Sequence, residues 1–388
     1  MVCPKLRALY NGAMDEKENI NFSLKEPLLI YAASKVFTWV VLLVCAALVW
    51  GTHRFGITVK HTVINWDAIW YLKIAMEGYD TARKTAFFPL LPAAIKLFSF
   101  FIKDPAWAGI IISNVASFFS AIFLYNLALK SFTKKAAMYA CAIFSAAPTA
   151  IFFTSIYTEP LFLALSCAFF ISLFSKKWFS AALLAAFACA CRLTGLFLIL
   201  PFAAAYLTQS MEKGGHWKII VYTAVILSGT GAYAFFLYLN TGDPFIFIRS
   251  QSVLWNNRTA IVMPFSLYIK NLGDLFSVIS GFNPQKTALS SLYFTAAIVF
   301  LIIGGLSIRK YGFENILYLG LFTIFLSTQP TTMSYSRYLA SIPQFWIIPA
   351  LYLSERNTPK VALFAVISAL LAWQVLIDMR WIAGFWVA

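Results

Sequence analysis

Runs of apolar residues, separated by short polar stretches, fill most of this chain. A helix needs about 20 consecutive apolar residues to cross the hydrocarbon core of a bilayer, and somewhat shorter runs also serve. The pattern therefore predicts an all-α polytopic membrane protein. The predicted spans are 29–51, 107–129, 136–153, 160–174, 219–239, 287–307, 314–328, 339–354 and 361–377.

The run at 178–208 is longer than one span requires and contains the interruption Arg192-Leu193-Thr194-Gly195. We expect two short helices that meet outside the membrane, which brings the total to about eleven transmembrane helices. A single tilted helix is the alternative, and it would invert the orientation of every later span.

Two longer polar intervals are expected on the exterior, a first loop at about 52–106 and a second segment at about 240–286. Within the first loop, residues 65–79 form an amphipathic run for which Asn65 is a plausible N-cap. Residues 86–102 are apolar, but two prolines and a lysine interrupt them. We expect a helix that lies in the membrane interface, with a further span as the alternative.

Composition and charge agree with this reading and set the orientation. The chain has 388 residues, of which 61% are hydrophobic and only 12% are charged, with a net charge of +15. Lys and Arg are enriched in cytoplasmic loops, so we predict a cytoplasmic tail at 1–28, a transmembrane domain at 29–388 and an exterior C-terminus. Topology and anionic membrane lipids explain the basic residues, and nucleic acid is not expected as a partner.

In this orientation the unusual polar residues all lie on the exterior face. Asp67 is a carboxylate beside apolar membrane, Glu159 precedes a proline at the mouth of a span, and Arg192 interrupts a hydrophobic hairpin. Plainer explanations exist: the dipole of a helix N-terminus stabilises an acid, Glu159 and Arg192 can pair with each other, and Arg337 can reach the interface as a snorkelling side chain. The interior loops are short and basic, and no phosphate-binding or zinc motif is found along the chain.

Several short motifs occur in a fixed order from about residue 60 to the C-terminus. The ordered set resembles the PIG-V-type mannosyltransferases of the GT-C superfamily of membrane glycosyltransferases. The motifs are Trp66-Asp67, Gly78-Tyr79, Ala86-Phe87-Phe88-Pro89-Leu90-Leu91-Pro92, Tyr157-Thr158-Glu159-Pro160-Leu161-Phe162, Arg192-Leu193-Thr194-Gly195, Gln251 to Trp255, Ser336-Arg337-Tyr338-Leu339 and Gly384-Phe385-Trp386-Val387-Ala388.

The resemblance implies a GT-C-like helical bundle, an essential acid at Asp67 and a polyprenyl-phosphate-linked sugar donor, which is dolichyl-phosphate-mannose in eukaryotes. At Thr158-Glu159-Pro160 the chain departs from eukaryotic members, which usually place Ser after the Glu. The chain also lacks their long insertions. We therefore expect a compact bacterial-type homologue, in a bacterial inner membrane rather than the endoplasmic reticulum, with a lipid or glycan acceptor that need not be the GPI precursor.

The chemistry of such a transfer assigns roles to the candidate residues. Breaking the bond between C1 of the sugar and phosphate oxygen passes through an oxocarbenium-like state, so we predict Asp67 as catalytic base in an inverting reaction. Glu159 is the second catalytic candidate: it can position the acceptor, hold Arg192, or bind a divalent cation together with Asp67, the one cofactor that we consider. Expected to bind the donor phosphate are Arg192, Arg337 and Arg380. Expected to contact substrate are Trp66, Trp70, Tyr157, Gln251 and Trp255.

Three other functions compete with this one. A lipid-linked glycan polymerase or ligase would have similar exterior loops. A secondary transporter would need ionisable groups near the bilayer midplane and internal repeats, whereas the spans contain almost no acids and no repeat stands out. A non-catalytic membrane subunit is the third alternative.

Overall fold

The computed structural model describes residues 22–50, 59–210, 217–254, 261–266, 269, 288–356 and 358–388. This part of the chain is mostly helical and contains no strand, which confirms the predicted all-α class. Of the predicted cytoplasmic tail, residues 1–21 lie outside the described residues, as does most of the second exterior segment beyond residue 254.

Long apolar helices identify a multi-pass membrane protein. In the described part, 5 helices are long and apolar enough to cross a membrane. Their lipid-compatible surfaces expose large side chains such as Leu239 and Phe364. These helices are α2 (Lys25–Trp50), α6 (Pro105–Ser131), α11 (Lys218–Thr241), α14 (Ala288–Leu306) and α19 (Lys360–Ile382).

Shorter helices occupy the other predicted spans. The predicted span at 136–153 is divided into a helix that ends at Ser145 and a 3₁₀ helix, η3 (Pro148–Phe153). The first residues of the span predicted at 339–354 belong to a separate short helix that carries Arg337, and the rest form a second helix. These helices are α7 (Lys134–Ser145), α8 (Glu159–Phe174), α9 (Trp178–Cys191), α10 (Ile199–Ser210), α15 (Ile308–Tyr311), α16 (Phe313–Ser327), α17 (Tyr335–Ala340) and α18 (Pro343–Glu355).

The run at 178–208 contains two helices, as predicted. Helix α9 ends at Cys191, and a 3₁₀ helix, η4 (Leu193–Leu198), leads into α10. The ring of Trp178, at the start of α9, lies 5.2 Å from that of Tyr206, late in α10, so α10 returns alongside α9. Gly195 permits this turn, because a Cβ atom there would come within 2.5 Å of the main chain of Ala188. Arg192 is thereby placed at the turn.

The first polar interval folds into α3 (Val59–Val63), α4 (Asp67–Glu77), η2 (Ala82–Ala86) and α5 (Leu90–Ile102). The expected N-cap at Asn65 is wrong: α4 begins at Asp67, and Trp66 holds the N-cap position with φ of 56° and no side-chain cap. Helix α5 has 13 residues, too few to cross a bilayer at about 1.5 Å per residue. Its length agrees with the expected interfacial helix, whose depth in the membrane stays a prediction.

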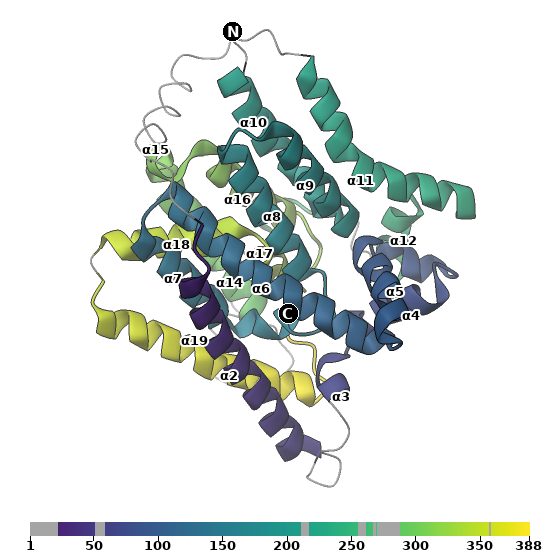
Figure 1. The fold of residues 1–388 in the computed structure, drawn as a ribbon, viewed down its shortest axis with the longest axis horizontal. Helices are drawn as coiled ribbons and strands as arrows, with labels where there is room; N and C mark the ends of the chain where they lie inside the picture. Colours follow the sequence, from purple (N-terminus) through teal and green to yellow (C-terminus); the bar gives the residue numbers. More distant parts are fainter. Residues whose placement is uncertain are drawn as a thin grey trace.

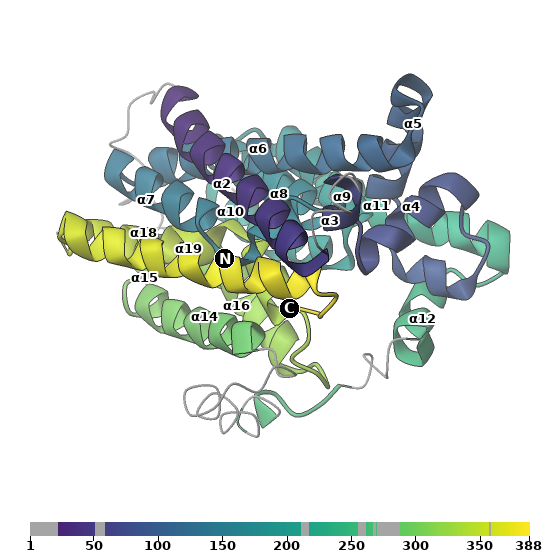
Figure 2. The same ribbon diagram turned by 90° about the horizontal axis from the view of Figure 1, so that it is seen from below.

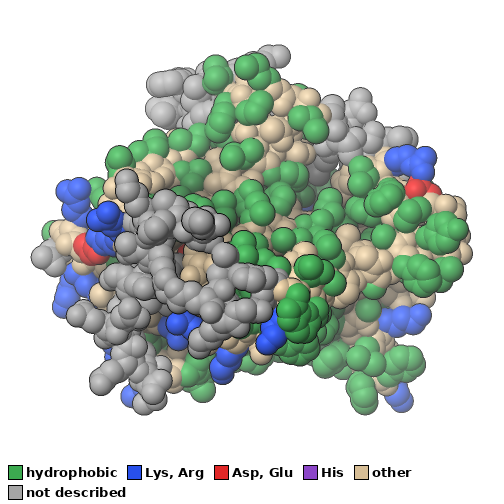
Figure 3. All heavy atoms as spheres, turned by 90° about the horizontal axis from the view of Figure 1, so that it is seen from above, with side chains coloured by type: hydrophobic (Ala, Val, Ile, Leu, Met, Phe, Trp, Pro, Cys, Tyr) green, Lys and Arg blue, Asp and Glu red, His purple; other side chains and the backbone are tan. Residues whose placement is uncertain are grey.

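The first and last described helices pack side by side. Figure 1 shows α2 and α19 together along one edge of the bundle, with α11 at the opposite edge, and Figure 2 shows the C-terminal end of the chain close to α3. Helix α12 (Ile246–Leu254) packs against η2 through a hydrogen bond of 2.8 Å between the hydroxyls of Ser250 and Thr85. Figure 3 shows one face of the molecule, where hydrophobic side chains are widespread and Lys and Arg lie mainly toward the margins.

Candidate active site

A cavity of about 640 Å³ lies where segments distant in sequence meet. Its wall takes residues from α4, the turn between α9 and η4, α12, α16, α17 and the C-terminal segment. Three of the predicted site residues with charged side chains, Asp67, Arg192 and Arg337, line it. The two tryptophans Trp66 and Trp386 also face it.

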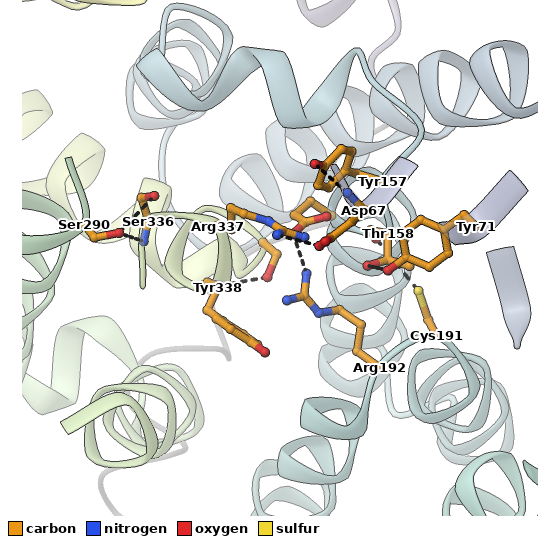
Figure 4. A network of polar contacts seen from close by, with 12 residues as sticks. Asp67, Tyr71, Tyr157, Thr158, Cys191, Arg192, Ser290, Ser336, Arg337 and Tyr338 are labelled. Atoms are coloured by element: carbon orange, nitrogen blue, oxygen red, sulfur yellow. Dashed lines mark hydrogen bonds and ion pairs between the residues drawn. The ribbon is translucent and has the colours of Figure 1, made fainter. Parts of the chain in front are cut away.

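Four charged side chains form a continuous network beside the cavity, and Figure 4 shows Asp67, Arg192 and Arg337 of this network. The Arg337 guanidinium donates from Nη1 to Asp67 Oδ2 at 2.8 Å and from Nε to Glu159 Oε1 at 2.7 Å. Arg192 Nη1 pairs with the same Glu159 oxygen at 3.0 Å. Glu159 is 0% exposed, whereas the Asp67 side chain is 20% exposed. The two acids and two arginines balance each other's charge, and only Glu159 is sealed from the cavity.

Helix ends place these groups. Asp67 and Glu159 each lie in the first turn of a helix, α4 and α8, where the helix dipole favours an anion. Arg192 follows the last residue of α9 in an extended conformation, at a helix end that favours a cation. Tyr157 fixes the start of α4, since its hydroxyl accepts from the Asp67 amide and donates to the Asn65 carbonyl, each at 3.3 Å.

Aromatic rings surround both arginines. The guanidinium carbon of Arg337 lies 4.6 Å from the ring centre of Tyr157 and 5.3 Å from those of Phe152 and Trp386. That of Arg192 lies 4.5 Å from the ring of Tyr338. A desolvated cation over an aromatic face is stabilised by about 2 kcal/mol. The rings therefore offset part of the free-energy cost of removing these cations from water.

The pKa of Arg337 lies well above its ordinary value. Burial alone would lower this pKa, but the carboxylates of Glu159 and then Asp67 favour the charged form more strongly. Arg337 therefore stays cationic at physiological pH, and the cluster keeps the positive charge of this guanidinium.

The structure brings some predicted substrate residues to the cavity and not others. Trp66 lines it and packs edge-on against Trp386 at 5.5 Å between ring centres. Gln251 lines it too, while its Nε2 donates to the Ala86 carbonyl at 3.2 Å. Tyr157 is fully buried beneath Arg337 and supports the cluster rather than contacting the cavity.

Two predicted site residues point elsewhere. Trp70 stacks on Phe87 with 6.1 Å between ring centres and does not line the cavity, so sugar stacking by Trp70 has no support. Arg380 lies over the ring of Phe385 at 5.8 Å and is also absent from the cavity wall, so the structure does not place it with the other two arginines. Trp255 lies outside the described residues.

Among the wall residues that were not predicted as site residues are Tyr71, Thr158 and Tyr338. Tyr71 follows Asp67 by four residues, which places both on one face of a helix, and that spacing could have identified it. Its hydroxyl lies 3.3 Å from that of Thr158. For Tyr338 the only signal in the sequence was its position next to Arg337 in the motif Ser336-Arg337-Tyr338-Leu339.

The arrangement of the carboxylates bears on the divalent cation considered above. Within the described ranges, no group of three or more His, Cys, Asp or Glu side chains is placed to hold a metal ion. Asp67 and Glu159 are joined by the guanidinium of Arg337. A cation bound to both carboxylates would have to displace that guanidinium, so the observed geometry does not fit a shared metal site.

The fold and the site together define a class: a multi-pass helical membrane protein with a buried cluster of acids and arginines at one end of a largely apolar cavity. Residues 55–212 match the family model described as Mannosyltransferase (PIG-V). The chain is also 32% identical over 157 residues to GPI mannosyltransferase 2 of Schizosaccharomyces pombe, a match that covers 39% of this chain and 34% of the yeast protein.

These matches confirm the resemblance to PIG-V-type mannosyltransferases for this part of the chain. The family match includes Asp67, Glu159 and Arg192, whereas Arg337 lies beyond it. The chain spans about a third of the length of its curated relative. The expected bacterial-type homologue and bacterial inner membrane find no support in a match to a fungal protein.

Proposed function

We propose that this protein is a membrane mannosyltransferase that moves mannose from a polyprenyl-phosphate donor to a hydroxyl of a lipid or glycan acceptor. The family match supports sugar transfer. The observation that carries the proposal is the cluster of Asp67, Arg337, Glu159 and Arg192, which places a partly exposed acid beside two cations in one cavity.

The cavity suits an amphiphilic, anionic donor. Arg192 and Arg337 supply positive charge at one end, and guanidinium groups bind phosphate oxygens in pairs of parallel hydrogen bonds. Much of the remaining wall is apolar, with Phe87, Phe88 and Phe325 among its residues. A phosphate attached to an isoprenoid chain satisfies both parts of this surface.

In the reaction, the acceptor oxygen forms a bond to C1 of mannose while the bond from C1 to the phosphate oxygen breaks. The electron pair of that bond stays with the phosphate, whose extra negative charge is stabilised by Arg192 and Arg337. The proton of the acceptor hydroxyl passes to Asp67. Attack opposite the leaving phosphate inverts the configuration at C1.

Arg337 Nη1 is bound to Asp67 Oδ2 at 2.8 Å. The guanidinium occupies Oδ2, one of the two carboxylate oxygens that could accept the proton of the acceptor hydroxyl. A donor phosphate competes for the same guanidinium, so donor binding frees Asp67 to accept the proton. Donor therefore binds before the acceptor is activated.

Glu159 fits one of the three roles considered for it. Its side chain is fully buried and is bound by both arginines, so acceptor contact and metal binding do not fit. We assign Glu159 the role of holding Arg192 and Arg337 in the orientation that meets the phosphate.

The acceptor and the membrane belong to this proposal as well. The name of the fission yeast relative makes a GPI precursor the first acceptor class to test. The active face is the exterior one, periplasmic or lumenal.

The test uses the purified full chain in lipid nanodiscs. Labelled mannose should reach an acceptor glycolipid from polyprenyl-phosphate-mannose and not from GDP-mannose. Transfer from the nucleotide sugar alone would contradict the proposed donor. Transfer of a preassembled oligosaccharide from a lipid carrier, with no transfer of single mannose, would favour the polymerase or ligase alternative.

A further inference from the structure

Lys35 in α2 and Asp378 in α19 lie within membrane-spanning helices and do not line the cavity. An ionisable side chain inside a bilayer is expensive and is usually retained for a function. Lys35 Nζ donates to the Phe153 carbonyl and to the Thr154 hydroxyl, each at 2.8 Å. The cation of the first span therefore binds the segment just after η3.

Asp378 belongs to the polar contacts between α19 and α2. Its side chain is fully buried. Gln374, one turn earlier in α19, donates to Asp378 Oδ2 at 3.3 Å and to the Thr38 hydroxyl of α2 at 2.8 Å. Helices α2 and α19 are thus joined by polar contacts at the level where Lys35 reaches η3.

The segment that Lys35 holds leads directly to the charged cluster. Thr154 is followed within a few residues by Tyr157, which fixes the amide of Asp67, and by Glu159, which binds both arginines. Asn114 of α6 holds the same segment from a different direction, donating to the Thr154 carbonyl at 3.0 Å. The main chain between η3 and α8 is consequently fixed at its first residues by side chains from α2 and α6.

We propose that Lys35 is a positioning residue for the transfer reaction. The inference rests on the proposed function. Lys35 acts through the 154–158 segment. By fixing this segment it determines the positions of the Tyr157 and Glu159 side chains, and these in turn determine the orientation of the Arg337 guanidinium. An apolar residue would fill the same space without the cost of a buried charge but would donate no hydrogen bond to Phe153 or Thr154.

The alternative is that Lys35 and Asp378 only stabilise the packing of α2 against α19. The double variant K35M/D378N separates the two explanations, because it removes both ionisable groups together. A purely stabilising pair predicts that a double variant that folds normally also works normally. A positioning role predicts normal folding and defective catalysis.

The experiment compares K35M, K35R, D378N and K35M/D378N with the wild-type chain in nanodiscs, with K25M at the exposed start of α2 as control. We expect K35M/D378N to unfold at nearly the wild-type temperature. Its kcat should fall about tenfold or more, as expected when catalytic groups are misplaced by a fraction of an ångström. Its KM for polyprenyl-phosphate-mannose should change little, because the apolar cavity wall is intact. K35R keeps donors for Phe153 and Thr154 and should recover part of kcat, and K25M should match the wild type.

A second readout needs no substrate. The amides of Thr154 and Ser155 donate to the Ile151 carbonyl at 3.1 and 2.9 Å, and hydrogen exchange at these amides should be faster in K35M/D378N than in the wild type. Wild-type kcat in a folded K35M/D378N, or unchanged exchange at 154–158, would overturn the proposal. Absence of mannose transfer by the wild type would instead overturn the proposed function, and the exchange rates would still decide whether Lys35 positions the segment.

Discussion

Replacing Glu159 by glutamine removes one negative charge and keeps the volume of the side chain. In the wild type this carboxylate is completely buried and is shared by Arg192 and Arg337. A neutral amide at this position would leave both guanidinium groups without their common anion, and Asp67 would be the only carboxylate left in contact with either of them. The change therefore tests whether Glu159 holds the cluster together.

The expected loss of stability is large. Removing one partner of a buried ion pair costs about 3–5 kcal/mol, because the remaining charge is left uncompensated. The substitution D67N is the matched comparison, since Asp67 is partly exposed and contacts a single arginine. Loss of one hydrogen bond to a charged group costs about 1–3 kcal/mol, so E159Q should be clearly less stable than D67N.

Reversible unfolding in mixed micelles, followed by tryptophan fluorescence, measures both values. Adding polyprenyl phosphate should stabilise E159Q more than the wild type, because its phosphate replaces the missing anion. A ligand present at 100 times its dissociation constant contributes about 2.7 kcal/mol. Stability of E159Q equal to that of D67N, or no preferential rescue by the phosphate, would refute the assignment of Glu159 as the anion that organises both arginines.

Three further predictions concern other parts of the molecule. R337K keeps a positive charge but cannot reach both carboxylates with a fixed fork of donors, so steady-state assays should show kcat lower by about 100-fold; near-normal kcat would contradict a bidentate role. G229A places a Cβ against a main-chain carbonyl of α9 and should cost about 1–3 kcal/mol in unfolding assays; the control G231A, where nothing lies within 4 Å, should be neutral. Cysteines at Lys135 and Met333, both exposed, should be labelled by an impermeant maleimide from opposite sides of the membrane in a background without Cys3; labelling from one side would contradict the predicted topology.

Much of the charged cluster could be predicted from sequence, for a physical reason. A charged side chain at the edge of a hydrophobic span is costly unless it is paired. Asp67, Glu159 and Arg192 occupy such positions next to the predicted spans, so they could be identified as candidate site residues. The loop charges set a common side for them, and the ordered motifs added Arg337. The structure then showed what neither signal contains, that Glu159 lies between the two arginines.

Two other predicted site residues do not line the cavity, because cavity contact depends on the direction of a single side chain. Trp70 is on the same short helix as Asp67, but three residues of rotation place it behind Phe87, on which it stacks, and Phe87 rather than Trp70 lines the cavity. Arg380 is on the predicted exterior side and still lies over Phe385. The predicted topology and the order of the motifs indicate on which side of the membrane a residue lies. Whether its side chain reaches the cavity depends on the rotation of its helix and on packing.

The contact between Lys35 and the segment after η3 could not be predicted at all. It joins the first span to a main-chain carbonyl, and a carbonyl has no signature in the sequence. Asp378 directly follows the predicted span at 361–377, and only the structure places it in a buried position within α19. Figure 1 shows that α19 lies beside α2, the helix that carries Lys35.

The most direct test of the account is mannose transfer by D67N. The variant should bind polyprenyl phosphate, because Arg192 and Arg337 are still held by Glu159, and it should transfer mannose at least about 100 times more slowly than the wild type, since general base catalysis supplies about 10²–10⁴-fold. D80N is the matched control: Asp80 is an exposed carboxylate of the same exterior loop, paired with Lys84 outside the cavity, and D80N should transfer at the wild-type rate. Undiminished transfer by D67N would contradict the central claim that Asp67 is the catalytic base.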